Sequence, residues 1–169
     1  MKYAIGIDLG GTKIKAGVIN QVGQIMTASA CATPLDGDAV LAAMIDLCRP
    51  LCETWDITAV GLGSPGLIAF PSGEVLGCTP NLNAWQGRSL KQALQQALNR
   101  PAVVDNDANA ACFGECTVSG YLGARLFVAL TLGTGAGQCC DDVRENASGL
   151  WPFWDRFWSY DCRASRTLV

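Results

Sequence analysis

A glycine-rich turn, residues 8–13 (DLGGTK), is the first segment whose residue types could do chemistry. It ends a stretch, residues 3–9, that has the composition of a strand. Paired glycines let the backbone approach a ligand closely, and successive N–H groups there can bind an anion. Thr12 adds a hydroxyl donor, and Asp8 can hold Mg²⁺ directly or through water. A plain hairpin turn is the alternative, and the combination of residue types favours phosphate binding.

A second turn of similar design, residues 132–137 (LGTGAG), follows another predicted strand. It again combines glycines for close approach with a Thr for a phosphate oxygen. Two such turns far apart in the sequence predict a nucleotide held between two lobes. The pattern GxxxxGK[ST] is absent, so the chain is not predicted to be a P-loop enzyme.

Residues 105–109 (DNDAN) lie after a predicted strand and at the start of a predicted helix. A helix N-terminus keeps a carboxylate ionised, so an Asp there is placed to accept a hydroxyl proton. Capping of the helix alone is the alternative, because Asp and Asn are favoured N-caps.

Two further segments could contact a ligand. Residues 61–66 (GLGSPG) match GxGxxG in spacing, but no helix opens after Pro65 and no acid ends a second strand about 20 residues on, which argues against a dinucleotide site. A turn that packs against a ligand fits better. Residues 79–85 (TPNLNAW) offer amides, a hydroxyl and the ring of Trp85, a mixture that suits a sugar, although such stretches are usually plain loops.

Composition excludes several classes of function. The chain has 169 residues and no His, which removes Ser-His-Asp and Cys-His catalysis, HExxH sites and Cys/His zinc sites. A net charge of −3 argues against a nucleic-acid surface. The start has no signal segment, and no apolar run is long enough to span a bilayer. We therefore expect a cytoplasmic protein that binds neither membranes nor nucleic acid, with its nine Cys reduced.

The elements that must position these motifs follow from periodicity. Three strands joined by tight turns predict an antiparallel meander, and a capping box at residues 89–92 opens a helix. Pro50 is expected to kink or shorten the first helix. Cys48/Cys52 and Cys112/Cys116 have helical spacing and are interpreted as core residues, with metal or redox use as the alternative. The expected strands are 3–9, 14–19, 24–31, 57–62, 67–70, 75–77, 102–105 and 126–132, with helices from Asp38, from 89 and over 107–118.

Together, the motifs of residues 3–137 resemble those of the ROK family (repressors, open reading frames and kinases). The resemblance implies an α/β, actin-like fold of the ribonuclease-H type, whose N-terminal lobe has a mixed sheet flanked by helices. It also implies a sugar kinase that uses ATP and Mg²⁺ to phosphorylate a hexose or N-acetylhexosamine hydroxyl, with the glucokinases favoured. Members are often homo-oligomers.

Each site role is carried over by position from this resemblance. Asp107 would be the catalytic base, and it would contact the sugar together with Gly66, Asn106, Thr79 and Asn81. Asp8 would lie near Mg²⁺. The two glycine turns would hold ATP through Asp8, Gly10, Gly11, Thr12, Lys13, Gly133, Thr134, Gly135 and Gly137.

The chain departs from the family pattern after residue 137. The family's His-containing sugar segment and Cys-rich zinc motif are absent, so no zinc site is expected although zinc is expected in the family. Residues 138–169 hold three of the five Trp but no Lys or Ile. We expect residues 1–120 to form the N-terminal lobe and 121–137 to be the first strand and phosphate loop of a second lobe that is largely missing. We expect 138–169 to be an aberrant tail that is read out of frame or is otherwise foreign to the fold.

Three alternatives stay open. Trp151, Trp154 and Trp158 share helical spacing, so the tail could be a helix with an aromatic stripe. The chain could be a truncated, non-catalytic fragment, and we expect no sugar-dependent ATP turnover from it alone. A sugar-responsive repressor lacking its DNA-binding domain is disfavoured, since only seven residues precede Asp8.

Overall fold

The computed structural model describes residues 1–77, 85–121, 127–132 and 136–141. The chain divides into two compact units, Met1–Asp107 and Ala108–Val169. In the described residues, no helix has both the length and the apolar character needed to cross a membrane.

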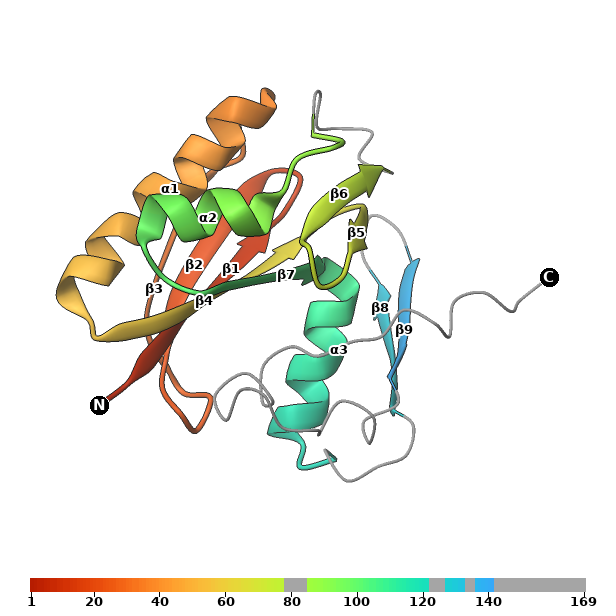
Figure 1. The fold of residues 1–169 in the computed structure, drawn as a ribbon. Coiled ribbons are helices and arrows are strands. Elements are labelled where there is room, and N and C mark those ends of the chain that lie inside the picture. Colours follow the sequence, from red (N-terminus) through yellow and green to blue (C-terminus); the bar gives the residue numbers. More distant parts are fainter. Residues whose placement is uncertain (78–84, 122–126, 133–135, 142–169) are drawn as a thin grey trace. The chain divides into compact units, whose positions relative to one another are not determined.

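A five-stranded mixed sheet in the order β3-β2-β1-β4-β7 forms the centre of the first unit (Figure 1). β1 (Tyr3–Leu9), β2 (Lys13–Ile19) and β3 (Ile25–Ala32) pair antiparallel, which confirms the predicted meander. β4 (Ile57–Ser64) and β7 (Ala102–Asn106) are parallel to β1. The side chains of β1 and β2 alternate between buried and more exposed, as expected for strands with one face on a core.

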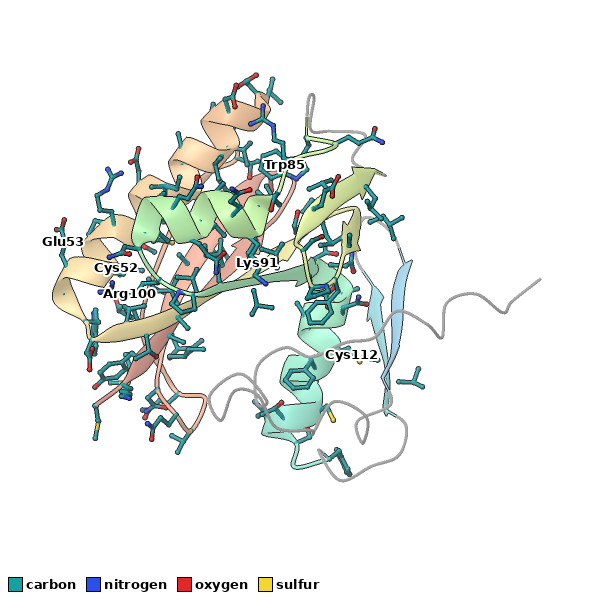
Figure 2. All side chains as sticks on the ribbon, in the orientation of Figure 1. Cys52, Glu53, Trp85, Lys91, Arg100 and Cys112 are labelled. Atoms are coloured by element: carbon teal, nitrogen blue, oxygen red, sulfur yellow. The ribbon has the colours of Figure 1, made fainter. Side chains whose placement is uncertain are left out.

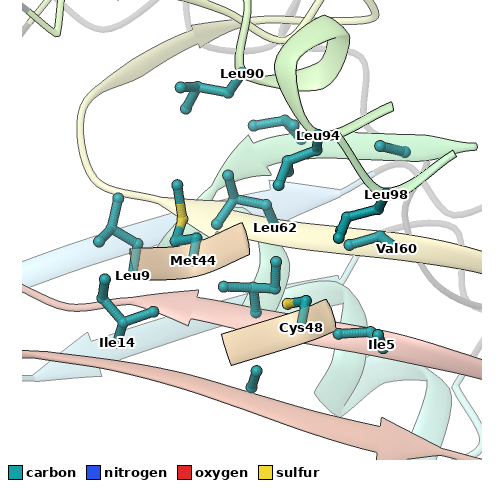
Figure 3. Packing of buried hydrophobic residues seen from close by; sticks show 14 of the residues in the cluster. Ile5, Leu9, Ile14, Met44, Cys48, Val60, Leu62, Leu90, Leu94 and Leu98 are labelled. Atoms are coloured by element: carbon teal, nitrogen blue, oxygen red, sulfur yellow. The ribbon is translucent and has the colours of Figure 1, made fainter. Parts of the chain in front are cut away.

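Two helices connect the parallel strands and cover the sheet. α1 (Gly37–Thr54) leads from β3 to β4, and α2 (Leu90–Leu98) precedes β7. α1 starts at Asp36, whose side chain accepts from the N–H groups of residues 38 and 39. α2 starts at the predicted cap Ser89, whose hydroxyl accepts from the N–H of Gln92. Figure 3 shows the side chains of both helices facing those of the sheet in one buried cluster, including Met44, Cys48, Leu90, Leu94 and Leu98 against Ile5, Leu9, Val60 and Leu62.

Pro50 does not shorten α1, so that part of the prediction is wrong, while the alternative of a kink stays a prediction. The helix continues past it to Thr54, whose hydroxyl donates to the Pro50 carbonyl oxygen at 2.8 Å. Leu51 and Trp55, beyond the proline, still pack against the core. Proline removes one donor of the helix, and this packing offsets that loss.

The predicted small hairpin is confirmed as β5 (Leu67–Ala69) and β6 (Glu74–Gly77). Gly73 in its turn has φ +68°, and a Cβ there would come within 2.6 Å of the Lys91 Cβ, so the turn requires glycine. Residues 85–89 then return beside β6. The Val75 N–H donates to the Arg88 carbonyl at 3.0 Å, and the Gly87 N–H donates to the Val75 carbonyl at 2.8 Å.

The second unit contains most of α3 (Asp107–Val118) and the antiparallel pair β8 (Phe127–Leu132) and β9 (Ala136–Asp141). The expected helix and the strand ending at residue 132 are therefore present. Residues 138–141, which were expected to belong to the tail, pair with β8 as part of β9. Cys112 and Cys116 are buried, as expected for core residues. Residues 142–169, with the three tail Trp, lie outside the described residues.

Candidate functional site

Three of the predicted motifs end at the same edge of the sheet. β1, β4 and β7 are parallel, so their carboxyl ends meet there. Asp8 is in register with Gly63, Gly63 with Asp105, and Ser64 with Asn106. Two strand spacings separate the outer residues, so the Cα atoms of Asp8 and Asp105 lie about 10 Å apart. Open α/β sheets bind ligands outside this edge.

The glycine turn, residues 10–13, closes tightly. The Gly10 N–H donates to the Lys13 carbonyl at 3.0 Å, and a Cβ on Gly10 would come within 2.9 Å of that same oxygen. A Cβ on Gly11 would meet no atom within 4 Å, so a ligand can approach there. Within the described residues, no hydrogen bond engages the N–H groups of Gly11 and Thr12. Free amides beside an open surface fit an anion such as a phosphate.

Thr33 holds the glycine turn from outside, and sequence reasoning gave it no role. Its N–H donates to the Thr12 carbonyl at 3.0 Å, and its hydroxyl donates to the Gly10 carbonyl at 2.7 Å. Thr33 directly follows β3, and the β2–β3 register places it opposite Thr12. The only signal that could have found it was the pairing register of the meander, since a lone Thr before Pro34 has no motif.

Asp8 lies at the end of β1 and forms an ion pair with Lys15, with 3.0 Å between Oδ2 and Nζ. Their side chains are 55% and 64% exposed, so the pair adds little stability and leaves the carboxylate accessible. The described part of the chain has no cluster of three or more metal-ligating side chains. A single accessible carboxylate fits Mg²⁺, which usually keeps waters and substrate phosphates as its other ligands.

Asn106 and Gly66, both predicted to contact the sugar, lie together. The Asn106 side-chain amide donates to the Gly66 carbonyl at 2.9 Å. Gly66 has φ +97°, which only glycine adopts without strain. The Asp105 carboxylate, 3% exposed, accepts the Asn106 backbone N–H at 2.6 Å and so fixes the end of β7.

Asp107 directly follows Asn106 and is the first residue of α3. Its side chain is exposed. The partial positive charge of a helix N-terminus stabilises a carboxylate at this position, which suits an acceptor for a hydroxyl proton. The three consecutive residues differ in their surroundings. The Asp105 carboxylate is buried and supports the end of β7, the Asn106 amide is bonded to the Gly66 carbonyl, and the Asp107 carboxylate is exposed.

The predicted aromatic contact to a sugar is wrong for Trp85. Its ring is fully buried in the core cluster just ahead of α2, so it cannot face a ligand (Figure 2). Beside it, the Gln86 side-chain amide donates to the Leu76 carbonyl at 2.8 Å. The sequence pattern could not separate a sugar-facing ring from a buried one, since both follow a polar loop.

Arg88 ties this region to the start of α1 through an ion pair with Asp38. The hydrogen bond from Arg88, together with its charge, holds the pKa of the Asp38 carboxyl below its usual value.

The remaining predicted site residues cannot be placed with the others. Thr79, Asn81, Gly133, Thr134 and Gly135 lie outside the described residues, and Gly137 lies in β9 of the second unit.

The sheet order 3-2-1-4-7, the two helices and the motifs at one carboxyl edge define the N-terminal lobe of an actin-like fold of the ribonuclease-H type. Residues 4–140 match the model of the ROK family. The chain therefore belongs to the ROK family.

The chain is similar to curated sugar kinases along most of its length. It is 36% identical over 137 residues to a glucokinase of Streptomyces coelicolor, covering 81% of this chain and 43% of that protein. It is 34% identical over 134 residues to an N-acetyl-D-glucosamine kinase of Erwinia tasmaniensis, covering 78% of this chain and 44% of that protein.

A solved structure agrees with these relatives. The ROK family glucokinase of Streptomyces griseus, in complex with glucose and AMPPNP, is 36% identical and superimposes with a TM-score of 0.74. The match covers 82% of this chain and 44% of that one. The chain thus spans a little under half the length of the relatives it matches.

Proposed function

We propose that this protein transfers the γ-phosphoryl group of ATP to a hydroxyl of a hexose or N-acetylhexosamine, with glucose as the favoured substrate. The observation that carries the proposal is the register of Asp8, Gly63 and Asp105 at one sheet edge. It brings a candidate anion turn and a candidate proton acceptor to the same side of one lobe. The names of the relatives support it, and a glucokinase of the family binds glucose and AMPPNP.

In this proposal the Asp107 carboxylate accepts the proton of the reacting hydroxyl. The sugar oxygen then forms its bond to the γ-phosphorus, and the bond from that phosphorus to the bridging oxygen of ADP breaks. A positioned base contributes about 10²–10⁴-fold in rate. Asn106, fixed on Gly66, orients the sugar, and alignment supplies much of the remaining acceleration.

The nucleotide contacts are proposed at the glycine turn. The unengaged N–H groups of Gly11 and Thr12 donate to phosphate oxygens, and the Thr12 hydroxyl adds another donor. Asp8 holds Mg²⁺, which neutralises phosphate charge. We propose that the second glycine turn completes the nucleotide site and that Thr79 and Asn81 complete the sugar site.

The test is sugar-dependent ADP formation by the purified chain, with glucose, N-acetylglucosamine and N-acetylmannosamine compared, alongside calorimetric binding of MgATP and each sugar. Turnover that Asp107→Asn lowers by at least about a hundredfold supports a kinase with Asp107 as base. Asp46→Asn, which alters an exposed carboxylate of α1 outside the site, is the matched control.

Binding of MgATP and sugar without turnover supports the non-catalytic alternative for this chain. Binding of neither ligand overturns the proposed function. Turnover that survives Asp107→Asn unchanged overturns the role of Asp107.

A further inference from the structure

We propose that Thr33 is a positioning residue for nucleotide binding, because it sets the direction in which the glycine turn presents its N–H groups. The inference rests on the proposed function, since it deepens the role of residues 10–13. Thr33 contacts the turn twice, through its hydroxyl to the Gly10 carbonyl at 2.7 Å and its N–H to the Thr12 carbonyl at 3.0 Å.

The hydroxyl contact controls the first peptide of the turn. The bond between Gly10 and Gly11 is trans, and in a trans peptide the C=O and the next N–H point in opposite directions. Because the Gly10 carbonyl is held toward Thr33, the Gly11 N–H points away from β3. That N–H has no partner within the described residues, and a Cβ on Gly11 would meet no atom within 4 Å.

The second contact fixes the far end of the same turn. The Thr12 carbonyl is drawn toward β3 by the Thr33 N–H, while the Gly10 N–H closes the turn on the Lys13 carbonyl at 3.0 Å. Two successive glycines would otherwise sample many backbone directions. Anion-binding amides work best when they are fixed before the ligand arrives, since less ordering then accompanies binding.

A purely structural role is the competing explanation, and the same sheet supplies a matched comparison. Thr58 makes the same kind of bond, from its hydroxyl to the Tyr3 carbonyl at 3.0 Å, at the opposite end of β1. Both threonine hydroxyl bonds are partly buried. Removing either bond should lower the free energy of unfolding by a similar amount. Only removal of the Thr33 bond should weaken the binding of MgATP.

The experiment compares Thr33→Val, Thr33→Ser and Thr58→Val in the full chain. Dissociation constants for MgATP are measured by calorimetry, and the order parameters of the Gly11 and Thr12 N–H groups are measured by NMR without nucleotide. We expect Thr33→Val to weaken MgATP binding by about five- to tenfold, the value of one hydrogen bond. Thr33→Ser keeps the hydroxyl and should stay within about twofold of the parent, as should Thr58→Val.

The NMR order parameters of the Gly11 and Thr12 N–H groups should fall only in Thr33→Val, because the turn then samples more backbone directions. Equal MgATP affinity of Thr33→Val and the parent overturns the inference, as does an equal loss in Thr58→Val. If no form of the chain binds MgATP, the nucleotide part of the proposed function fails, and the order parameters still decide the positioning role. Lower order parameters at Gly11 in Thr33→Val alone then support it, and unchanged order parameters overturn it.

Discussion

The side-chain amide of Asn106 donates to the carbonyl oxygen of Gly66 at 2.9 Å, across 40 residues of sequence. This bond joins the end of β7 to the turn after β4. One of the two proposed sugar-binding motifs therefore holds the other, and a change in either residue should alter the position of both.

Gly66→Ala tests this relationship. At φ +97° a Cβ costs about 1–2 kcal/mol, so we expect the free energy of unfolding in urea to fall by about that amount. Sugar affinity should fall as well, because the carbonyl that holds Asn106 moves. Gly6→Ala is the control, since a Cβ there meets no atom within 4 Å and its φ lies outside the left-handed region. Equal stability of the two variants would contradict the prediction.

The contribution of the Arg88–Asp38 ion pair to the free energy of unfolding should decrease in acid. Its hydrogen bond and charge lower the pKa of Asp38 in the folded chain. A carboxyl whose pKa is lowered by folding stabilises the fold above its unfolded pKa, near 3.9, and loses this contribution as the pH falls through its folded pKa.

Arg88→Gln should therefore raise the Asp38 pKa toward its ordinary value, as followed by NMR titration of the carboxyl carbon. The stability difference between parent and variant should shrink below about pH 4. Asp38→Asn identifies the signal by removing it. An unchanged Asp38 titration in Arg88→Gln would show that the pair does not form in solution.

Trp85 should tolerate loss of its N–H better than loss of its ring. The ring is fully buried, while Nε1 has no hydrogen-bond partner in the part of the chain that the structure describes. Trp85→Ala should cost about 3–5 kcal/mol in the free energy of unfolding. Trp85→Phe removes a buried donor without a partner, whose burial costs about 1–3 kcal/mol. This gain offsets part of the free energy that is lost with the smaller ring. We expect its net cost to be under about 1.5 kcal/mol; equal costs would refute this account.

Cys48 should be nearly inert to thiol reagents. Burial, with a smaller contribution from Cys52, raises the pKa of its thiol to about 12, which leaves about one thiolate in 10⁴ at pH 8. Cys31 is only partly buried. In the native chain, mass spectrometry should find Cys31 labelled at least about a hundredfold faster than Cys48, and labelling in urea should equalise the two. Similar native rates would mean that α1 opens locally.

Local patterns predicted the strands and helices well, because periodicity, caps and turns are properties of neighbouring residues. The meander from Tyr3 to Ala32 follows from them. The parallel pairs β1–β4 and β4–β7 do not, since nothing local shows that Gly63 pairs with both Asp8 and Asp105. The hydrogen bond from the Thr33 hydroxyl to the Gly10 carbonyl could not be predicted from local sequence either, because it depends on the register between β2 and β3.

Two errors have the same physical origin. Pro50 was expected to kink or shorten α1, yet the helix is not shortened, because packing of Leu51 and Trp55 on the core carries it on to Thr54. Trp85 was assigned to a ligand because its neighbours are polar, yet its ring completes the core. In both cases tertiary packing outweighs what the surrounding residues favour.

The order of strands in the sheet also sets the order in which the first unit can fold during synthesis. β1, β2 and β3 leave the ribosome first and can pair at once, since their turns are short. β4 then joins the free side of β1, and β7 joins β4, so no later strand has to insert between earlier ones. The edge that carries Asp8, Gly63 and Asn106 is complete only when β7 has been made, and a nascent chain should gain this proposed ligand-binding edge as the last step of building the sheet.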